Sequence, residues 1–450
     1  MSINVCDGVA AYFLNVAFFT FCYEVMLLPF VTEIDLIYRL AKKKKQSNKI
    51  MSKMSKENEA YSSSSSLKEK GRALMELGRL KFLAYSPIMY SIGAVVSCLS
   101  DGKPFQVKEY FIGIAVVYGL HAMTHFFNEY VDFDTDTINA AASPWTGGSQ
   151  VLVKGLLPRK IALYAGLILI ASVGVFVMYT FHAVSYHIYA VYVAVSGMIL
   201  AGQYSLPPIR ASRRCMGELW VTLVLNFLCP LESYLLQHSG DGSPFPSHVF
   251  WKCLIPIGKF VCFVYASTCL FFYWKKKKIV GIVEYVRMMV MNMNDIQADK
   301  AVNKITLPVF LGLNTSAKVH NVGMAFSYFI LAVLYLFWNE NEHGKSGIPT
   351  TVFVLLLLTL PFAYHYSRLV HVRPFRYELP FYASQHNCAC MLAVYLGIVL
   401  DGIFNLHPNH KSRFELFFSQ QYAACFLFPL VVLIPSLPVL LNNIRRAKFD

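Results

Sequence analysis

Residues 125–136, HFFNEYVDFDTD, decide how the rest of the chain is interpreted, because they place carboxylates directly after an apolar run, residues 110–127. Asn128, Asp132 and Asp136 are four residues apart, so on a helix they drift by only about 40° per step and share one face. Carboxylates beside a membrane-crossing run are costly unless they bind cations or line a cavity. The stretch therefore predicts a transmembrane helix that ends in a cation site.

A second polar cluster lies far downstream and has the same character. Asn292, Asp295 and Asp299, in the stretch MNMNDIQAD, again end an apolar run. Two carboxylate clusters at the ends of two membrane-crossing helices indicate hard divalent cations, with a phosphate-bearing ligand between them.

Composition indicates a multi-pass, all-α membrane protein. Of the 450 residues, 56% are hydrophobic and only 15% are charged, and the mean hydropathy is +0.46. Apolar runs of about 20 residues cross a bilayer as helices, because only a helix pairs all of its own backbone groups in lipid. One membrane-crossing helix must immediately precede Asp295, and the others are predicted near residues 82–99, 108–130, 161–181, 185–205, 217–237, 321–338, 349–369, 387–405 and 420–441.

The net charge of +14 follows the loops. The basic residues flank the apolar runs and form no single surface, which argues against nucleic-acid binding. If the helices alternate in direction, the basic loops all lie on one side, and the positive-inside rule makes that side cytoplasmic. Both aspartate clusters fall on this side. The organelle stays open, with the endoplasmic reticulum and mitochondrial membranes as the two alternatives.

Several motifs together resemble those of one enzyme family. Asn128-x3-Asp132-x3-Asp136 and Asp295-x3-Asp299 resemble the two aspartate-rich motifs of the UbiA superfamily of intramembrane prenyltransferases. The branch that looks nearest is the 1,4-dihydroxy-2-naphthoate prenyltransferases of menaquinone synthesis, with their eukaryotic relatives. Three further stretches agree in order and spacing: GGSQVLVKGLL (147–157), YSLPPIRASRRCMGE (204–218) and DKAVNKITLPVFLG (299–312).

The resemblance implies a bundle of about nine core helices, to which this chain adds extra N- and C-terminal helices. We expect a hydrophobic anchor or extra span at residues 1–40 and a disordered Lys/Ser-rich linker at 41–74. The UbiA-like domain follows at 75–405, and a C-terminal helix with a basic tail occupies 406–450.

The region 252–293 contains two apolar runs separated by a run of lysines, Lys275 to Lys278. If both crossed the membrane, the two aspartate clusters would lie on opposite sides. We therefore expect an insertion around residues 258–280, and a retained intron in the gene prediction would account for its composition.

An allylic diphosphate needs metal ions for its leaving group, basic side chains to hold it and a dry apolar pocket for its tail. Magnesium takes oxygen ligands from one or two carboxylates plus phosphate oxygens and stabilises the departing diphosphate as a Lewis acid. The resemblance implies two Mg²⁺ ions. The expected metal ligands are Asn128, Asp132, Asp136, Asp295 and Asp299, and the four aspartates are also the expected catalytic residues.

Other polar residues are expected around these ligands. Glu129 and Asp134 lie off the motif-one face, so we expect them beside the metal ligands and not among them. For His121 and His125, cavity hydrogen bonding and deprotonation of an acceptor both stay open. The resemblance places diphosphate-binding residues in the loops, and the candidates are Lys154, Arg159, Tyr204, Arg210 and Lys304.

The sequence therefore predicts an enzyme that transfers a polyprenyl group from an isoprenyl diphosphate to an aromatic, quinone-precursor-like acceptor. A UbiA-type terpene cyclase, which uses no aromatic acceptor, is the alternative, and a transporter is the more distant one. Three departures from quinone-pathway relatives bear on the acceptor and leave the metal ligands intact. Glu129 stands where relatives often have Asp, Asn294 where they often have Arg, and Asn303 where they often have Gly.

Overall fold

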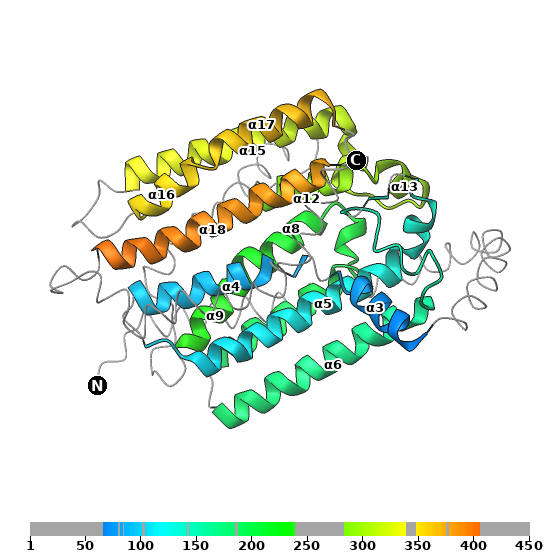
Figure 1. The fold of residues 1–450 in the computed structure, drawn as a ribbon, viewed down its shortest axis with the longest axis horizontal. Coiled ribbons are helices and arrows are strands. Elements are labelled where there is room, and N and C mark those ends of the chain that lie inside the picture. Colours follow the sequence, from blue (N-terminus) through cyan, green and yellow to red (C-terminus); the bar gives the residue numbers. More distant parts are fainter. Residues whose placement is uncertain are drawn as a thin grey trace.

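A computed structural model describes the chain from Ser66 to Asn405, with gaps at residues 80–81, 84, 101–103, 141, 144, 185–187, 239–282, 339–347 and 375–377. Within these residues every extended regular element is a helix, and the only β-type pairing is an isolated bridge between Arg214 and Ile305. The expected all-α architecture is therefore confirmed for the described part of the chain (Figure 1).

Six helical segments are long and apolar enough to cross a membrane, judged by length and composition: 107–138, 159–181, 188–205, 217–237, 350–372 and 379–402. The element bounds are α3 Leu67–Leu77, α4 Tyr85–Val95, α5 Val107–Ile138, α6 Arg159–Val184, α7 Ile188–Gln203, α8 Gly217–Thr222, α9 Cys229–Gln237, α12 Val283–Met293, α13 Ile296–Ala301, α14 Leu307–Leu311, α15 Leu313–Trp338, α16 Thr350–Leu357, α17 Leu360–Val372 and α18 Leu379–Asn405. Most of the predicted spans coincide with these helices. The run at 349–369 is divided into α16 and α17 where Pro361, in the first turn of α17, cannot donate a backbone hydrogen bond to the preceding turn.

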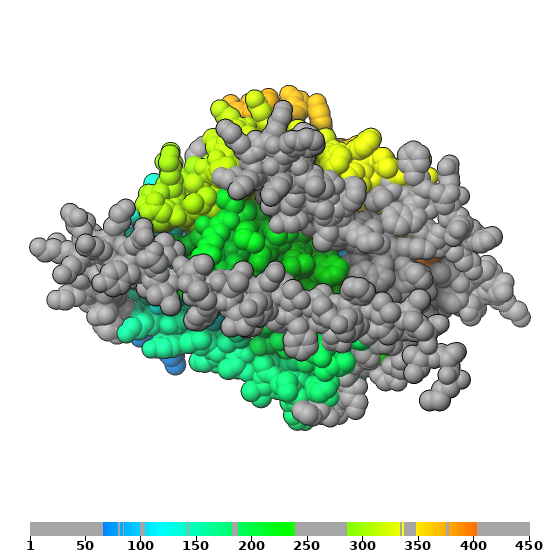
Figure 2. Space-filling model, turned by 180° about the vertical axis from the view of Figure 1, so that it is seen from behind, coloured from blue at the N-terminus to red at the C-terminus, as the bar shows by residue number. Residues whose placement is uncertain are grey.

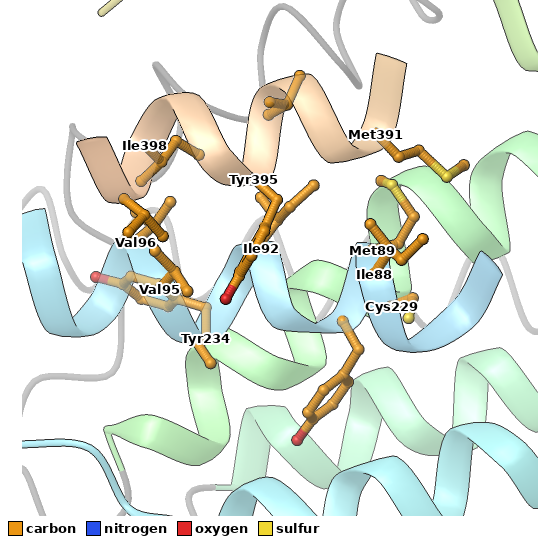
Figure 3. Close-up of a cluster of buried hydrophobic side chains, with 14 of the residues drawn as sticks. Ile88, Met89, Ile92, Val95, Val96, Cys229, Tyr234, Met391, Tyr395 and Ile398 are labelled. Carbon is orange, nitrogen blue, oxygen red and sulfur yellow. The ribbon is translucent and has the colours of Figure 1, made fainter. Parts of the chain in front are cut away.

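Helix α4 forms the centre of the bundle, and all eleven of its residues are buried. It packs between α9 and α18, where Ile92, Tyr234 and Tyr395 belong to one hydrophobic cluster (Figure 3). Gly93 allows the approach of α9, because a Cβ there would overlap the carbonyl of Pro230. Helix α4 thus joins the N-terminal helices to α18.

The long helices lie side by side, with α6 at one edge and α15 to α17 at the other (Figure 1). The C-terminal end of α5 lies at the same end of the bundle as α3 and α13. On the reverse face, the bright-green residues around α8 and α9 lie between the yellow-green and the teal-green helices (Figure 2). Because α13 contacts α5, the polar end of α5 lies beside the polar end of the α12–α13 region.

The segment preceding the core is helical where we expected the end of a disordered linker. Ser66 and Glu69 form a capping box at the start of α3, and Ala73 and Leu77 are buried. The linker prediction is therefore wrong for residues 67–74, because a local cap and an apolar face outweigh the polar composition. The predicted anchor (1–40), the rest of the linker, the insertion (258–280), the span at 420–441 and the C-terminal segment (406–450) lie outside the described residues.

Candidate active site

One lysine joins the two aspartate clusters. The Nζ of Lys304 lies 2.8 Å from Oδ2 of Asp132, on α5, and 3.3 Å from Oδ1 of Asp299, on α13. All three side chains are buried or nearly so. The structure therefore places the two clusters in one site at one end of the bundle.

The first cluster is built by the regular geometry of α5. Asn128, Asp132 and Asp136 follow one face of this 32-residue helix, and the two aspartates are buried. The amide Nδ2 of Asn128 donates a 2.8 Å hydrogen bond to Oδ2 of Asp132. Asn128 is thus already oriented by the carboxylate one turn away, with its oxygen left as the group that suits a cation.

The second cluster lies where the helix is interrupted. Helix α12 ends at Met293 and α13 begins at Ile296, so Asp295 lies between two helices. Its Oδ1 accepts a 2.7 Å hydrogen bond from Nδ2 of Asn139, which follows α5. Oδ2 of Asp299 lies 3.3 Å from the hydroxyl of Thr306. Asp295 is therefore oriented by the residue that follows α5, and Asp299 by a residue seven positions further along the chain.

Asn292 and Asn294 complete this second region. The Nδ2 of Asn292 donates a 2.9 Å hydrogen bond to Oε1 of Glu218, which is buried at the start of α8. Asn294, which stands where relatives often have Arg, is also buried, and its Nδ2 has no hydrogen-bond partner among the described residues. An amide at this position adds no charge beside the aspartates.

Burial raises the pKa values of the two aspartates in the second cluster. Burial, together with the carboxylates of Asp295 and Asp132, raises the pKa of Asp299 to about 7, against the opposing effect of Lys304. Burial also raises the pKa of Asp295. Burial alone would lower the pKa of Lys304, but Asp132 and Asp299 raise it above its ordinary value. Lys304 therefore stays charged and offsets part of the negative charge.

The donor set suits magnesium held in one particular way. No group of three His, Cys, Asp or Glu side chains converges on a single point among the residues that the structure describes. Magnesium is characteristically held by one or two carboxylates, with substrate phosphates and water completing its octahedral shell. Aspartates on two elements at one end fit that arrangement, in which a diphosphate supplies the remaining ligands.

Arg213 also reaches the site, although the sequence did not single it out from its neighbours. Its Nη2 lies 3.6 Å from Oδ1 of Asp132 and donates a 3.2 Å hydrogen bond to the carbonyl of Val131. The backbone here is fixed to the motif-two loop, since the amide of Cys215 bonds to the carbonyl of Ile305 at 2.8 Å. The predicted Arg210 lies in the same loop with a left-handed backbone, φ 50°.

Arg79 is a second basic residue that the sequence did not identify. It bonds through Nε to Oε1 of Glu129 at 2.6 Å. The same carboxylate receives the amide of Ser149 at 2.7 Å and its hydroxyl at 2.8 Å. Burial would lower the pKa of Arg79, but Glu129 and Asp136 raise it above its ordinary value. The carboxylate of Glu129 is thus bound by Arg79 and by Ser149 of the loop that follows α5.

The glycine-rich loop closes over the first cluster. Gly148 has φ +75° and lies so close to Asp136 that a Cβ would overlap the carboxylate. Both the backbone conformation and the contact therefore require glycine. Gly148 therefore packs directly against the carboxylate of Asp136.

Two of the expected basic residues lie elsewhere. Arg159 pairs with Asp134 at 3.3 Å and stacks over the rings of Tyr130 and Phe133, at 4.9 and 5.0 Å from their centroids. These partners occupy a different face of α5 from Asp132. Lys154 is exposed in the turn before α6. The structure therefore does not bring these two side chains against the aspartates.

A cavity begins beside the clusters and continues among the helices. Arg79, Asn128 and Tyr204 line it near the aspartates, and His121 and His125 line it further along α5. Its other walls are mostly apolar side chains of α5, α7, α12 and the segment from α8 to α9, including Val116, Leu120, Leu200, Val224 and Met291. Polar residues near the aspartates and mostly apolar walls elsewhere suit a ligand with a charged head and a hydrocarbon tail.

The fold is a bundle of helices long and apolar enough to cross a membrane, with two aspartate clusters at one end. The profile of the UbiA prenyltransferase family matches residues 88–382, well over half of the chain. The chain belongs to this family and is a multi-pass membrane protein. No curated protein matches it significantly.

Three solved structures resemble the chain over most of their length. A UbiA homolog from Aeropyrum pernix K1 is 14% identical, with a TM-score of 0.49 over 72% of this chain and 98% of that one. A homolog from Archaeoglobus fulgidus, solved with DMAPP and Mg²⁺, is 13% identical with a TM-score of 0.45, over 72% and 98%. A digeranylgeranylglyceryl phosphate synthase is 16% identical with a TM-score of 0.44, over 73% and 99%.

Proposed function

We propose that this protein transfers a polyprenyl group, within the membrane, from an isoprenyl diphosphate to an aromatic acceptor of the quinone-precursor type. The observation that carries the proposal is the position of the two clusters. Lys304 lies between Asp132 and Asp299, and Asn128, which donates a hydrogen bond to Asp132, lines a cavity whose walls are mostly apolar. A diphosphate held at these aspartates leaves its hydrocarbon tail inside the cavity.

The aspartates, with Asn128, are proposed to hold two magnesium ions against the same diphosphate. When bound, magnesium supplies Lewis-acid stabilisation of the leaving diphosphate. Lys304, Arg213 and Arg79 add positive charge at the same end, where a leaving group accumulates negative charge. Tyr204 and Arg210 remain proposed diphosphate contacts, and Lys154 and Arg159 would reach the diphosphate only if the turn before α6 and the start of α6 moved.

The apolar cavity protects the reaction from water. Loss of diphosphate leaves an allylic carbon with cationic character at the polar end, and water there would hydrolyse it. The acceptor ring attacks this carbon, a carbon–carbon bond replaces the carbon–oxygen bond, and the ring loses a proton. His125 lines this part of the cavity and is a candidate to take that proton, directly or through the acceptor hydroxyl.

We further propose that the aspartate end faces the cytoplasm, since the basic loops gather on that side. The exposed Lys300, next to Asp299, provides the test. A Lys300→Cys variant should react with a membrane-impermeant maleimide from the cytoplasmic side only. Labelling from the opposite side alone would reverse the assignment.

The decisive experiment incubates the purified full-length protein with Mg²⁺, isoprenyl diphosphates of several lengths, and either 1,4-dihydroxy-2-naphthoate or no acceptor. The expected result is a prenylated naphthoquinone precursor that forms only when diphosphate, acceptor and Mg²⁺ are all present. Cyclic hydrocarbons formed without acceptor would replace the proposal with a terpene cyclase. An Asp132→Ala variant that retained full turnover would refute the role of the site.

A further inference from the structure

Helix α3 carries apolar side chains on its outer side as well as on the side that faces the bundle. Ala73 and Leu77 are buried in a hydrophobic cluster with side chains of α5 and α6. Leu67 and Leu74, almost two turns apart and therefore nearly in line, are 88% and 40% exposed, and Met75 is 57% exposed. We refer to Leu67, Leu74 and Met75 as the outer stripe. An exposed apolar stripe marks a place where a helix contacts something apolar.

The packing of α3 places it at the boundary of the bilayer. Its buried residues share a hydrophobic cluster with Phe126 of α5 and Ala162 of α6 (Figure 1). Phe126 lies about 28 Å along α5 from Val107, its first residue, and the hydrocarbon core of a bilayer is about 30 Å thick. Ala162 lies in the first turn of the membrane-crossing segment that begins at Arg159. Both neighbours therefore hold α3 at the level where hydrocarbon gives way to lipid headgroups.

Hydrogen bonds fix both ends of α3. At its start, the amide of Ser66 donates to Oε2 of Glu69 at 2.8 Å, and the amide of Glu69 donates to the hydroxyl of Ser66 at 3.3 Å. Just after its end, Nε of Arg79 donates to Oε1 of Glu129, on α5, at 2.6 Å. The chain itself therefore forms and orients this helix, and the outer stripe is left for a further contact.

Positive charge accompanies the outer stripe. Four lysines lie on α3, in the turn before α6 or in the first turn of α6: Lys68, Lys70, Lys154 and Lys160. All of them except Lys70 are exposed. The acidic side chains of α3 are already engaged, since Glu69 belongs to the cap and Glu76 pairs with Arg72 at 3.3 Å. The turn before α6 packs on α3 through Leu157, so these segments form one positively charged surface.

We propose that the outer stripe and these four lysines form a docking surface for anionic lipid. Helix α3 lies on the bilayer, the outer stripe enters the headgroup layer, and the lysines contact the negatively charged headgroups. Interfacial helices combine an apolar face with Lys and Arg in this way, and each basic residue near an anionic leaflet strengthens the binding. The level of α3 and its positive charge favour lipid over a protein partner. This inference does not depend on the reaction that the protein catalyses.

The test uses the full-length protein in lipid nanodiscs that hold one copy each, made from phosphatidylcholine with or without phosphatidylserine. Hydrogen–deuterium exchange of the α3 amides is followed by mass spectrometry, and the melting temperature reports on the integrity of each variant. The docking variants are Lys68→Gln/Lys160→Gln and Leu67→Gln/Met75→Gln. The matched control is Lys300→Gln/Lys318→Gln, which removes two exposed lysines from α13 and α15.

In the parent, the α3 amides should exchange about tenfold more slowly in discs that contain phosphatidylserine, because docking opposes the opening of the helix. Lys68→Gln/Lys160→Gln should reduce this difference to about twofold, since each lysine contributes to the attraction. Leu67→Gln/Met75→Gln should also lose most of the difference, because the stripe no longer enters the headgroup layer. The control should keep the difference of the parent.

Equal exchange of the parent α3 amides in the two kinds of disc would overturn the proposal. A loss in the control as large as that in Lys68→Gln/Lys160→Gln would also overturn it, because any lysine would then have the same effect. Slow exchange that appears only in discs with two copies, or only after another protein is added, would replace lipid by a protein partner.

Discussion

The two aspartate clusters are built in different ways. The first lies on α5, a continuous helix of 32 residues in which a four-residue spacing alone aligns Asn128, Asp132 and Asp136. The second lies across an interruption, where α12, α13 and α14 are short and Asp295 belongs to none of them. Helix geometry therefore fixes the first cluster, whereas hydrogen bonds from Asn139 and from the nearby Thr306 orient the second.

This difference makes the two clusters sensitive to different changes. In the first, the backbone holds its conformation whether or not the polar groups are present. In the second, Asn139 and Thr306 orient the carboxylates from outside, and Lys304 joins them to the first cluster. The predictions below test this comparison, from the largest expected effect to the smallest.

Removing one carboxylate from either cluster should have the largest effect. Asp132→Ala and Asp295→Ala should each lower turnover by about a thousandfold or more, because each removes a proposed ligand of the Mg²⁺ that would stabilise the leaving diphosphate. Asp134→Ala is the matched control, since Asp134 is partly exposed and pairs with Arg159 on another face of α5. Titration calorimetry with a non-hydrolysable diphosphate checks both motif variants. Unchanged Mg²⁺-dependent binding in either one would refute a shared site.

Lys304→Met should break the connection between the clusters. It leaves Asp132 and Asp299 without their shared cation, so the folded state should lose roughly 3 kcal/mol, and turnover should fall about a hundredfold. Mg²⁺ should raise the melting temperature of this variant more than that of the parent. Lys300→Met, which removes an exposed lysine nearby, should change neither property. Equal effects of the two substitutions would show that Lys304 is not the connection.

Gly148→Ala should disturb the first cluster through its loop. The added Cβ overlaps the carboxylate of Asp136 and sits on a backbone with φ +75°, so turnover should fall by about 10- to 100-fold. Gly71→Ala is the control, because nothing lies within 4 Å of a Cβ there, in α3. That variant should be as active as the parent, and its helix should be slightly more stable. Full activity of Gly148→Ala would mean that the loop moves freely from Asp136.

Asn128→Ala should weaken binding of Mg²⁺ and of diphosphate by about tenfold, because it removes a neutral oxygen and a hydrogen bond to Asp132. Asn128→Asp keeps an oxygen but adds negative charge beside two carboxylates, so it should lower turnover and shift the Mg²⁺ dependence. Both are measured by Mg²⁺ titration of activity. If Asn128→Ala matches the parent in midpoint and maximal rate, the residue is structural.

Lowering the pH should weaken Mg²⁺ binding by a few-fold per unit below about pH 7. Asp299, with its pKa near 7, gains a proton there, and a protonated carboxyl group is a poor ligand for a cation. Above pH 7 the affinity should level off. Calorimetry in buffers of different ionisation enthalpy should show proton release on Mg²⁺ binding at pH 6.5 and little at pH 8. Equal proton release at both values would contradict the assignment.

The first cluster illustrates how far the sequence could be read without a structure. Spacing in one stretch predicted that Asn128, Asp132 and Asp136 share a face, and they do. The apolar runs predicted most of the helices. The sequence also contains the capping-box pair of α3, Ser66 and Glu69. The polar composition of the segment nevertheless led to the prediction of a disordered linker.

The basic residues illustrate where such reading ends. Of the loop arginines, Arg210 was expected at the site, but the described contact with Asp132 comes from Arg213. Arg79 was not expected there at all, and it contacts Glu129 fifty residues further along the chain. A positive charge near a membrane-crossing helix is explained by topology alone, so sequence could not separate these residues from Lys154.

The sequence by itself determined the helices, the identity of the paired carboxylates and the family, because helical periodicity, apolar run length and motif spacing are local properties. Only the tertiary structure decided that Lys304 joins the two clusters, that Arg213 and Arg79 are the nearby cations, and that α3 packs against α5 and α6. These contacts join segments up to 172 residues apart. Their geometry depends on how the helices pack, and packing is a property of the whole bundle and of no single segment.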